Sequence, residues 1–323
     1  PNTLAINDSE VQARHVVIAS GAKPMHLGIS GEEHLIDNEG FLQLERLPDR
    51  IVLVGGGYIA AEFSHIAARA GAAVTILQRG PRLLPQFEPE LVGWLMEAFE
   101  TIGVDVRTNT EVIAIEENGG SFIVHTRVGD ESGAVHADLV VHAAGRTPAL
   151  EQLDLPAGGV AAESGRLLLN EYLQSVSNPS VYAAGDAAQW GPPLTPVSSH
   201  DAKVVAANLL DGNHSTPNYA GVPSVAFTLP PIASVGVTEA QAREAGLRFQ
   251  LKTERTSDWY TARRVAEQVY GYKALVEEGT GRILGAHLVG PHADEVINLF
   301  GLAIRHGLTA DDLKSTMLSL IHI

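Results

Sequence analysis

The sequence predicts an α/β protein built around a doubly wound nucleotide-binding sheet, with an α+β unit after it. Three observations predict this fold. Apolar strands and amphipathic helices alternate over residues 51–109 in the order β-α-β-α-β, the pattern of a mononucleotide-binding fold. A glycine-rich turn joins the first of these strands to its helix. From residue 222 the pattern changes to strands flanked by helices.

The segments that precede the glycine-rich turn are short. Apolar runs at residues 4–8 (LAIND) and 15–20 (HVVIAS) predict two strands. Residues 21–24 (GAKP) predict a turn, because glycine and proline interrupt regular structure. Residues 51–54 (IVLV) predict the strand that leads into the glycine-rich turn.

The next elements complete the alternating pattern. A helix is expected from Tyr58 to Ala70, where Gly71 ends it, and a second helix over 88–103, whose apolar residues recur at helical spacing. The β-rich segments beside and after them span 73–77, 104–109, 111–120, 121–128 and 134–145. Asn-Gly-Gly at 118–120 predicts a hairpin. This order indicates a doubly wound sheet with an antiparallel insertion.

The rest of the chain is predicted in two parts. Between 145 and 217 the pattern is looser, with a strand at 181–185 and a helix near 200–210. The elements expected after residue 222 are strands at 225–229, 268–278 and 282–290 and helices at 238–246 and 293–307. They indicate an α+β unit.

Composition argues against several classes of function. Thirty-eight acidic and twenty-two basic residues give a net charge of −16, which repels nucleic acid and anionic membranes, so we expect neither as a partner. No apolar run approaches the roughly 20 residues that a membrane helix needs. The sequence has no cysteine, which favours a reducing, cytoplasmic compartment and leaves no thiol nucleophile. Its histidines lack metal-ligand spacing, so we expect no metal.

The glycine-rich turn carries the first functional signal. Gly55, Gly57 and Ala60 form G-x-G-x-x-A directly after a strand and at the start of a helix. Gly55 permits a tight turn, Gly57 lets a pyrophosphate approach the backbone, and Ala60 lets the helix pack closely on the strand. We therefore expect the first turn of this helix, with Tyr58 and Ile59, to bind a dinucleotide. The alternative is a glycine turn that only shapes an α/β core.

The end of the following strand indicates which dinucleotide binds. NAD-binding folds place an acidic side chain about 20 residues after the glycines, where it binds the ribose 2′-hydroxyl. Gln78 occupies that position here, with Arg79 and Arg82 close behind it. A guanidinium suits a 2′-phosphate and no carboxylate repels it, so NADPH is favoured and NADH stays possible. The alternative is that both arginines are solvated loop residues.

Five segments in order resemble the FAD-dependent pyridine nucleotide-disulfide oxidoreductases, the family of glutathione reductase, dihydrolipoamide dehydrogenase and mercuric reductase. They are VVIASGAKP, VGGGYIAAEF, VHAAGRTP, VYAAGDAA with LTPVSSHDA, and FTLPPIASVGVTEAQA. The resemblance implies nucleotide-binding domains of the FAD/NAD(P) type, a C-terminal α+β dimerisation domain and a homodimer. It places the remnant of an FAD-binding domain at 1–45, an NAD(P)H-binding domain at 46–145, the second part of the FAD-binding domain at 146–217 and a truncated dimerisation domain at 218–323.

The resemblance also implies roles for single residues. Asp186 would contact the ribityl chain of FAD, with Gly185 permitting close approach and Thr195 near the flavin ring. Tyr58 corresponds to an aromatic residue that covers the flavin until nicotinamide arrives, and Glu62 to an acid near the nicotinamide, so these two are the candidate catalytic residues. The remaining cofactor-binding candidates, in the segments that pass between the nucleotide domains, are Ser20, Gly21, Gly145 and Arg146.

The sequence departs from the family pattern at both ends. It lacks the family's first G-x-G-x-x-G, the C-x-x-x-x-C redox pair and the His-Pro motif near the C-terminus, so we expect a chain that is incomplete at both ends. The implied reaction passes hydride from NADPH to FAD and electrons on to a disulfide-type acceptor, as in glutathione reductase, with the redox cysteines outside these residues. Activity of the dihydrolipoamide dehydrogenase or mercuric reductase type, or a non-catalytic fragment that binds nucleotide and dimerises, stays open.

Overall fold

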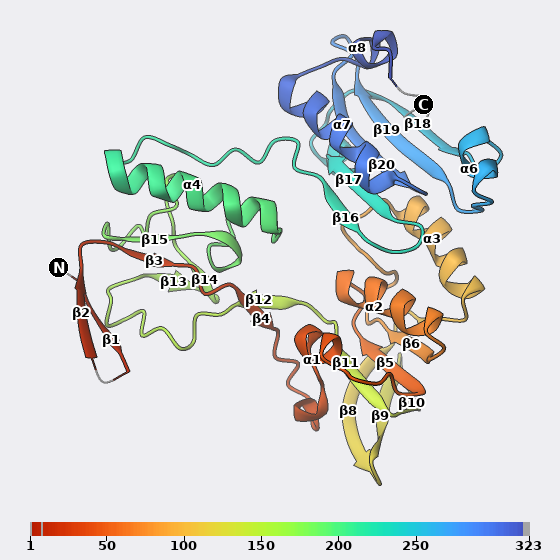
Figure 1. Cartoon of the computed structure of the whole chain (residues 1–323), viewed down its shortest axis with the longest axis horizontal. Helices are drawn as coiled ribbons and strands as arrows, with labels where there is room; N and C mark the ends of the chain where they lie inside the picture. The colour runs from red at the N-terminus through yellow and green to blue at the C-terminus, as the bar shows by residue number, and fades with distance from the viewer. Residues whose placement is uncertain (1, 8, 319–323) are drawn as a thin grey trace. The chain divides into compact units, whose positions relative to one another are not determined.

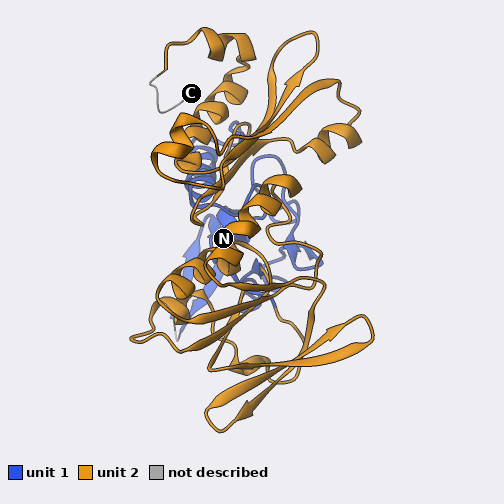
Figure 2. Ribbon diagram, turned by 90° about the vertical axis from the view of Figure 1, so that its right-hand side faces the viewer, with its two compact units in different colours: residues 1–25, 146–219 blue, residues 26–145, 220–323 orange. Residues whose placement is uncertain are grey.

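The computed structural model describes residues 2–7 and 9–318, which form two compact units (Figure 2). Unit 1 consists of residues 1–25 and 146–219, and unit 2 of residues 26–145 and 220–323. The chain thus enters unit 2 twice. The four domain segments expected from the sequence, with their three boundaries, stay a prediction.

Unit 2 contains the predicted doubly wound sheet. Its four parallel strands have the order β11-β5-β6-β7, with bounds Leu139–His142, Arg50–Val54, Ala73–Leu77 and Asp105–Arg107. Helix α2 (Tyr58–Arg69) joins β5 to β6, and α3 (Pro89–Thr101) joins β6 to β7 (Figure 1). The strands read as continuous apolar runs because both faces of the sheet are covered; Leu53 and Ile76 are fully buried.

An antiparallel sheet is inserted before the last parallel strand. It has the order β10-β9-β8, and its strands span Glu131–Ala137, Ser121–Val128 and Glu111–Asn118. The predicted hairpin is confirmed, since Asn118 pairs with Ser121 and both Gly119 and Gly120 between them have positive φ. The expected continuous segment 134–145 is instead split between β10 and β11. Asp138 divides it, because its carboxylate accepts hydrogen bonds from the backbone N–H and Nε of Arg50.

The C-terminal part of unit 2 is a five-stranded antiparallel sheet. Its order is β16-β17-β20-β19-β18, with bounds Ser224–Ala226, Ile232–Gly236, Ile283–Val289, Gly271–Glu277 and Phe249–Arg255. Helix α7 (Ala293–His306) packs on β17 and β20, and the short helices are α5 (Glu239–Glu244), α6 (Tyr260–Arg264) and α8 (Ala310–Ser315). Residues from this sheet, such as Ile232 and Val289, share one core with Leu91 and Leu95 of α3.

Unit 1 is formed from two distant stretches of sequence. Strand β3 (Val16–Ile18) pairs in parallel with β15 (Val181–Ala183), and β4 (Ala22–Pro24) pairs antiparallel with β12 (Arg146–Pro148). Two further hairpins are β1–β2 (Asn2–Ile6, Ser9–Ala13) and β13–β14 (Ala162–Glu163, Arg166–Leu167). The first strand expected from the sequence extends to Asp8, which lies outside the described residues.

Two expectations for local structure were wrong in detail, and one strand was not predicted. Residues 22–24 form a strand rather than the whole of a turn, and Gly21, with φ of 70°, makes the bend that precedes it. Helix α4 (Thr195–Asp211) begins five residues before the predicted start, with proline in its first turn, where the missing N–H costs nothing. Strand β18 went unpredicted because four of its seven residues carry charged or amide side chains, as edge strands often do.

Among residues 2–7 and 9–318, no helix is long and apolar enough to cross a membrane.

Candidate functional site

The glycine-rich turn follows β5 at the carboxyl end of the parallel sheet. Gly55 donates its N–H to Leu77 O at 2.8 Å and has φ of 113°. A Cβ at Gly55 would lie 2.3 Å from Ala143 O and 2.5 Å from Ala144 Cα. These are backbone atoms that have no rotamer to change, so only glycine fits this turn.

Gly57 differs from Gly55, because the fold itself does not require glycine at this position. A Cβ there would meet, among the described residues, only Ala143 O, at the ordinary contact distance of 3.9 Å, and φ is −89°. The fold therefore leaves room above Gly57 and imposes no strain that needs glycine. Gly57 is also the N-cap of α2 and has no side chain to cap the helix. Open space beside an uncapped helix N-terminus is suited to a bound anion.

The first turn of α2 supplies the amides for such an anion. Ala61 N donates to Gly57 O at 3.0 Å, and the amides of Tyr58, Ile59 and Ala60 precede it in the turn. Ala60 is fully buried against the sheet, so a larger side chain would push the helix away. The predicted role of alanine at this position agrees with its packing.

The three residues predicted to select the nucleotide behave differently from one another. The Gln78 side chain folds over the turn; a Cβ on Gly56 would lie 2.9 Å from its Cγ and Cδ. Arg82 donates to Pro85 O at 2.7 Å and to Phe87 O at 3.4 Å, so it holds its own loop together. Arg79 is exposed, and no hydrogen bond or ion pair joins it to another residue of 2–7 or 9–318. Of the two arginines, only Arg79 is free to bind a ligand.

The two candidate catalytic residues lie on one face of α2, four residues apart. The Tyr58 ring packs edge-on against Phe87, with centroids 5.8 Å apart. The Glu62 carboxylate accepts the backbone N–H of Phe227 at 3.0 Å, from the loop after β16. Burial raises the pKa of Glu62, and the Phe227 hydrogen bond opposes this only in part. Glu62 thus connects α2 to the loop that follows β16 of the C-terminal sheet.

The other candidates lie mostly in unit 1. Gly145, with φ of 109°, ends the first part of unit 2, and Arg146 begins β12, where its guanidinium donates to Ala22 O. Ser20 is exposed, and Gly21 O accepts a hydrogen bond from Ala149 N at 2.9 Å. These residues hold the segments where the chain passes between the units.

A second turn in unit 1 contains the remaining candidates. Gly185 opens a short 3-10 helix, has φ of 64°, and a Cβ there would lie 2.6 Å from Ser198 Oγ. Asp186 is half-buried in the same turn, and Thr195 is exposed at the first residue of α4. Helix α4 packs against the 3-10 turn, so the structure brings Gly185, Asp186 and the start of α4 together.

Sequence reasoning missed the residue that holds this turn. Asp201 in α4 is fully buried; its Oδ2 accepts the Gly185 N–H at 3.0 Å and its Oδ1 accepts the Tyr219 hydroxyl at 2.6 Å. Burial and the Asp201 carboxylate raise the pKa of Tyr219, so its hydroxyl stays protonated and donates. A signal was present in the sequence: Asp201 shares the apolar face of its helix with Val197 and Val204.

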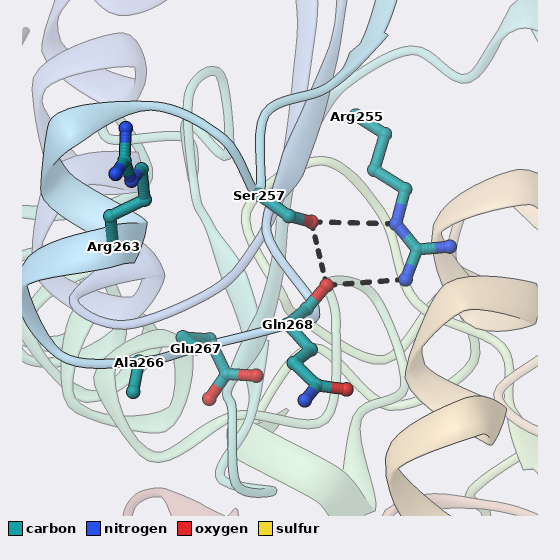
Figure 3. Close-up of a pocket in the computed structure, with 6 residues that line it drawn as sticks. All are labelled: Arg255, Ser257, Arg263, Ala266, Glu267 and Gln268. Carbon is teal, nitrogen blue, oxygen red and sulfur yellow. Dashed lines mark hydrogen bonds between the residues drawn. The ribbon is translucent and has the colours of Figure 1, made fainter.

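A cavity of about 460 Å³ lies elsewhere, in the C-terminal part of unit 2 (Figure 3). Three of its polar side chains bond to the protein itself: Arg255 binds Glu97 and Gln268 O, Ser257 Oγ donates to Gln268 O at 2.6 Å, and Glu267 accepts the N–H of Val269 at 2.8 Å. We therefore do not assign a ligand to it. Within residues 2–7 and 9–318, no group of three or more His, Asp or Glu side chains is arranged to hold a metal ion.

Comparisons with known proteins find matches along most of the chain. The family model for pyridine nucleotide-disulphide oxidoreductases matches residues 2–202, and the model for the dimerisation domain of the same family matches residues 222–320. A mercuric reductase from Staphylococcus aureus is 35% identical over 97% of this chain and 58% of its own length. A glutathione reductase from Burkholderia cepacia is 32% identical over 98% of this chain and 70% of its own length.

A solved structure shows the same fold. The Cu(II) complex of the HOCl-induced flavoprotein disulfide reductase RclA from Escherichia coli superposes with a TM-score of 0.88 at 28% identity, over 98% of this chain and 72% of that one. The chain spans only 50% and 58% of the length of two mercuric reductases that it resembles, from Bacillus cereus and Staphylococcus aureus.

Proposed function

Because the chain belongs to the pyridine nucleotide-disulphide oxidoreductase family, we propose that it binds NADPH and FAD in an oxidoreductase that passes electrons to a disulfide-type acceptor. The observation that carries the proposal is the space above Gly57, which the fold leaves open beside the uncapped N-terminus of α2. A pyrophosphate fits that space chemically, because backbone amides and the helix dipole favour an anion there.

In this proposal α2 positions the nicotinamide nucleotide. The amides of Tyr58, Ile59 and Ala60 bind the pyrophosphate, and the Tyr58 ring, held by Phe87, limits access to the site. Glu62 lies one turn further along and is partly withdrawn from water, so its carboxylate orients polar groups of the nucleotide without competing hydration. NADPH supplies the hydride when bound.

Selection of NADPH over NADH rests on Arg79. Gln78 brings no negative charge to the position where NAD-binding folds carry an acid, and Arg82 is held by backbone carbonyls. Arg79 remains, exposed at the carboxyl end of β6, with its guanidinium available for a 2′-phosphate.

Unit 1 provides the flavin-binding residues in this proposal. A glycine with φ of 64° and Asp186 form a tight turn at the N-terminus of α4, a 17-residue helix, and buried Asp201 fixes that turn. FAD supplies the redox chemistry when bound, while the chain binds and orients it. A purified chain that carries the visible absorption band of flavin would support this assignment; a colourless chain that still binds NADPH would favour a non-catalytic nucleotide-binding module.

The acceptor is proposed at the level of chemical class. The similar proteins include mercuric reductases, a glutathione reductase and a flavoprotein disulfide reductase. This chain has no cysteine, so the thiols of a disulfide-reducing centre are not among its residues. We propose a small disulfide as acceptor, and mercuric ion is the second candidate.

Charge reversal at Arg79 tests the proposal. Arg79→Glu should weaken NADPH binding about 10- to 100-fold, since a charged hydrogen bond contributes about 1.5–3 kcal/mol, and should change NADH binding little. Isothermal titration with each nucleotide measures both affinities. Arg46→Glu is the matched control, because Arg46 is also exposed but precedes β5 at the opposite edge of the sheet. Equal losses for NADPH and NADH would refute the role of Arg79.

A further inference from the structure

The loop that carries Arg79 ends in a buried ion cluster. Lys273 of β19 is 1% exposed, and its Nζ lies 2.9 Å from Glu88 Oε2, 3.0 Å from Glu90 Oε2 and 2.6 Å from Glu239 Oε2. Glu88 is 2% exposed and precedes the first residue of α3. The cluster therefore joins the start of α3 to the C-terminal sheet and to α5.

Lys273 carries a positive charge within this cluster. Burial alone would lower the pKa of Lys273, but the hydrogen bonds to Glu239, Glu88 and Glu90 raise it above its usual value. Burial also lowers the pKa of His287, whose Nε2 lies 3.8 Å from Glu88 Oε1, so His287 is neutral at pH 7. Lys273 is thus the ammonium that compensates the buried Glu88 carboxylate.

Among residues 2–7 and 9–318, no charged donor other than Lys273 lies within hydrogen-bond distance of the Glu88 carboxylate. Its Oε1 accepts the backbone N–H of Glu239 at 2.6 Å, and its Oε2 accepts from Lys273. Removal of Lys273 would leave a buried carboxylate beside the carboxylates of Glu90 and Glu239. A buried charge that loses its partner is strongly unfavourable, so Glu88 would move toward water.

Movement of Glu88 would reach the nucleotide-binding turn through a short loop. Residues 78–88 run from the end of β6 to α3, and Leu84 N donates to Gly56 O at 2.7 Å. Leu83, Leu84 and Phe87 in this loop are at most 1% exposed, and Phe87 packs on Tyr58. The loop is therefore held at its middle by Gly56 and at its far end by Lys273, while beside Arg79 the N–H of Asn109 donates to Gly80 O at 2.9 Å.

We propose that Lys273 is a positioning residue for nucleotide selection: it fixes Glu88, and through the loop 78–88 it sets the place of Arg79 beside the glycine-rich turn. The inference rests on the proposed binding of NADPH. In this proposal a residue of the C-terminal sheet influences the preference for NADPH over NADH, although Lys273 contacts neither nucleotide.

A double-mutant cycle between Lys273 and Arg79 tests the inference. Lys273→Met removes the charge and keeps most of the side-chain length, and Arg79→Ala removes the proposed phosphate ligand. We expect Lys273→Met to lower the preference for NADPH over NADH about tenfold in the parent chain, and not at all when Arg79 is already alanine. Titration of both nucleotides gives the preference, and a thermal scan gives the stability.

Two further variants separate positioning from folding. Lys273→Arg keeps the charge and should restore most of the preference. Arg255→Met is the matched control, since Arg255 also ties α3 to the C-terminal sheet, through Glu97 at 2.8 and 2.7 Å, but nine residues beyond Glu88. It should lower the melting temperature and leave the preference unchanged. If Lys273→Met does not fold, Glu88→Gln replaces it, and we expect the same decrease in the preference for NADPH over NADH.

The outcomes are distinguishable. An unchanged preference in folded Lys273→Met or Glu88→Gln, with a clear loss in Arg79→Ala, would overturn the role of Lys273 and leave the NADPH site intact. If Arg79→Ala itself does not weaken NADPH binding, the proposed selection of NADPH fails, and this inference fails with it.

Discussion

Substitution of Gly57 by alanine should separate nucleotide binding from folding. The added Cβ would stand 3.9 Å from Ala143 O, and φ of −89° suits any residue, so the folded chain can accept it. Alanine restricts the conformations of the unfolded chain, which stabilises the folded protein by about 0.4–1 kcal/mol. Alanine is also a poorer N-cap residue than glycine, which destabilises the folded protein by a similar amount. The melting temperature should therefore shift by no more than about 4 °C.

Nucleotide binding should respond much more strongly. The methyl group of Gly57→Ala would occupy the space proposed for the pyrophosphate and lengthen its hydrogen bonds to the amides of the first turn of α2. Loss of one hydrogen bond to a charged group costs about 1.5–3 kcal/mol, which corresponds to a fall in affinity of about 10- to 100-fold. NADPH and NADH should lose affinity equally, because both carry the pyrophosphate.

The assay pairs nucleotide titration with thermal unfolding. Gly93→Ala serves as a control, since Gly93 is exposed within α3 and its Cβ would meet no atom within 4 Å. It should raise stability by about 1 kcal/mol and leave nucleotide binding unchanged. Gly55→Ala should instead destabilise the fold, because of the 2.3 Å approach to Ala143 O. Normal nucleotide affinity in a stable Gly57→Ala chain would refute the assignment of this turn.

Two further predictions concern pH and assembly. His65 in α2 is 3% exposed, and burial, with a smaller effect of Arg69, lowers its pKa from 6.5 to about 4. Between pH 6.5 and about pH 4, His65 is therefore protonated in the unfolded chain and neutral in the folded chain. The free energy of unfolding should fall by up to about 3 kcal/mol as the pH is lowered through this window. Denaturant titrations of His65→Leu should show a smaller decrease in stability over the same pH range. Because residues 222–320 match a dimerisation domain, we expect a two-fold homodimer, and light scattering at micromolar concentration that found only monomer would contradict this.

Much of the fold was predictable because its signals are local. The β-α-β-α-β order of unit 2 follows from apolar runs of strand length, helical spacing and glycine punctuation, all of which act between neighbouring residues. The hairpin at Gly119 and Gly120 was predictable for the same reason. Strand β18 was not, since five of its seven residues are exposed at the edge of the sheet, where polar and apolar side chains are both accepted.

The candidate site was predictable only in part. Gly55, Gly57 and Ala60 were identified from spacing, because backbone geometry at a strand–helix turn depends on a few adjacent residues. The different behaviour of Arg79 and Arg82 could not be predicted, since it depends on which carbonyl groups the loop presents to each guanidinium. Asp201 and Lys273 were missed because a buried charge is recognised by its distant partners.

The sequence by itself determined the order of elements, the glycine-rich turn and the resemblance to a flavoprotein family, since these depend on residue type and spacing along the chain. Tertiary structure alone decided that Gly57 faces open space, that Arg79 is the free arginine, and that Lys273 binds the far end of the loop that carries Arg79. The physical reason is that burial and charge pairing join residues far apart in sequence: Lys273 and Glu88 are 185 positions apart and 2.9 Å from one another.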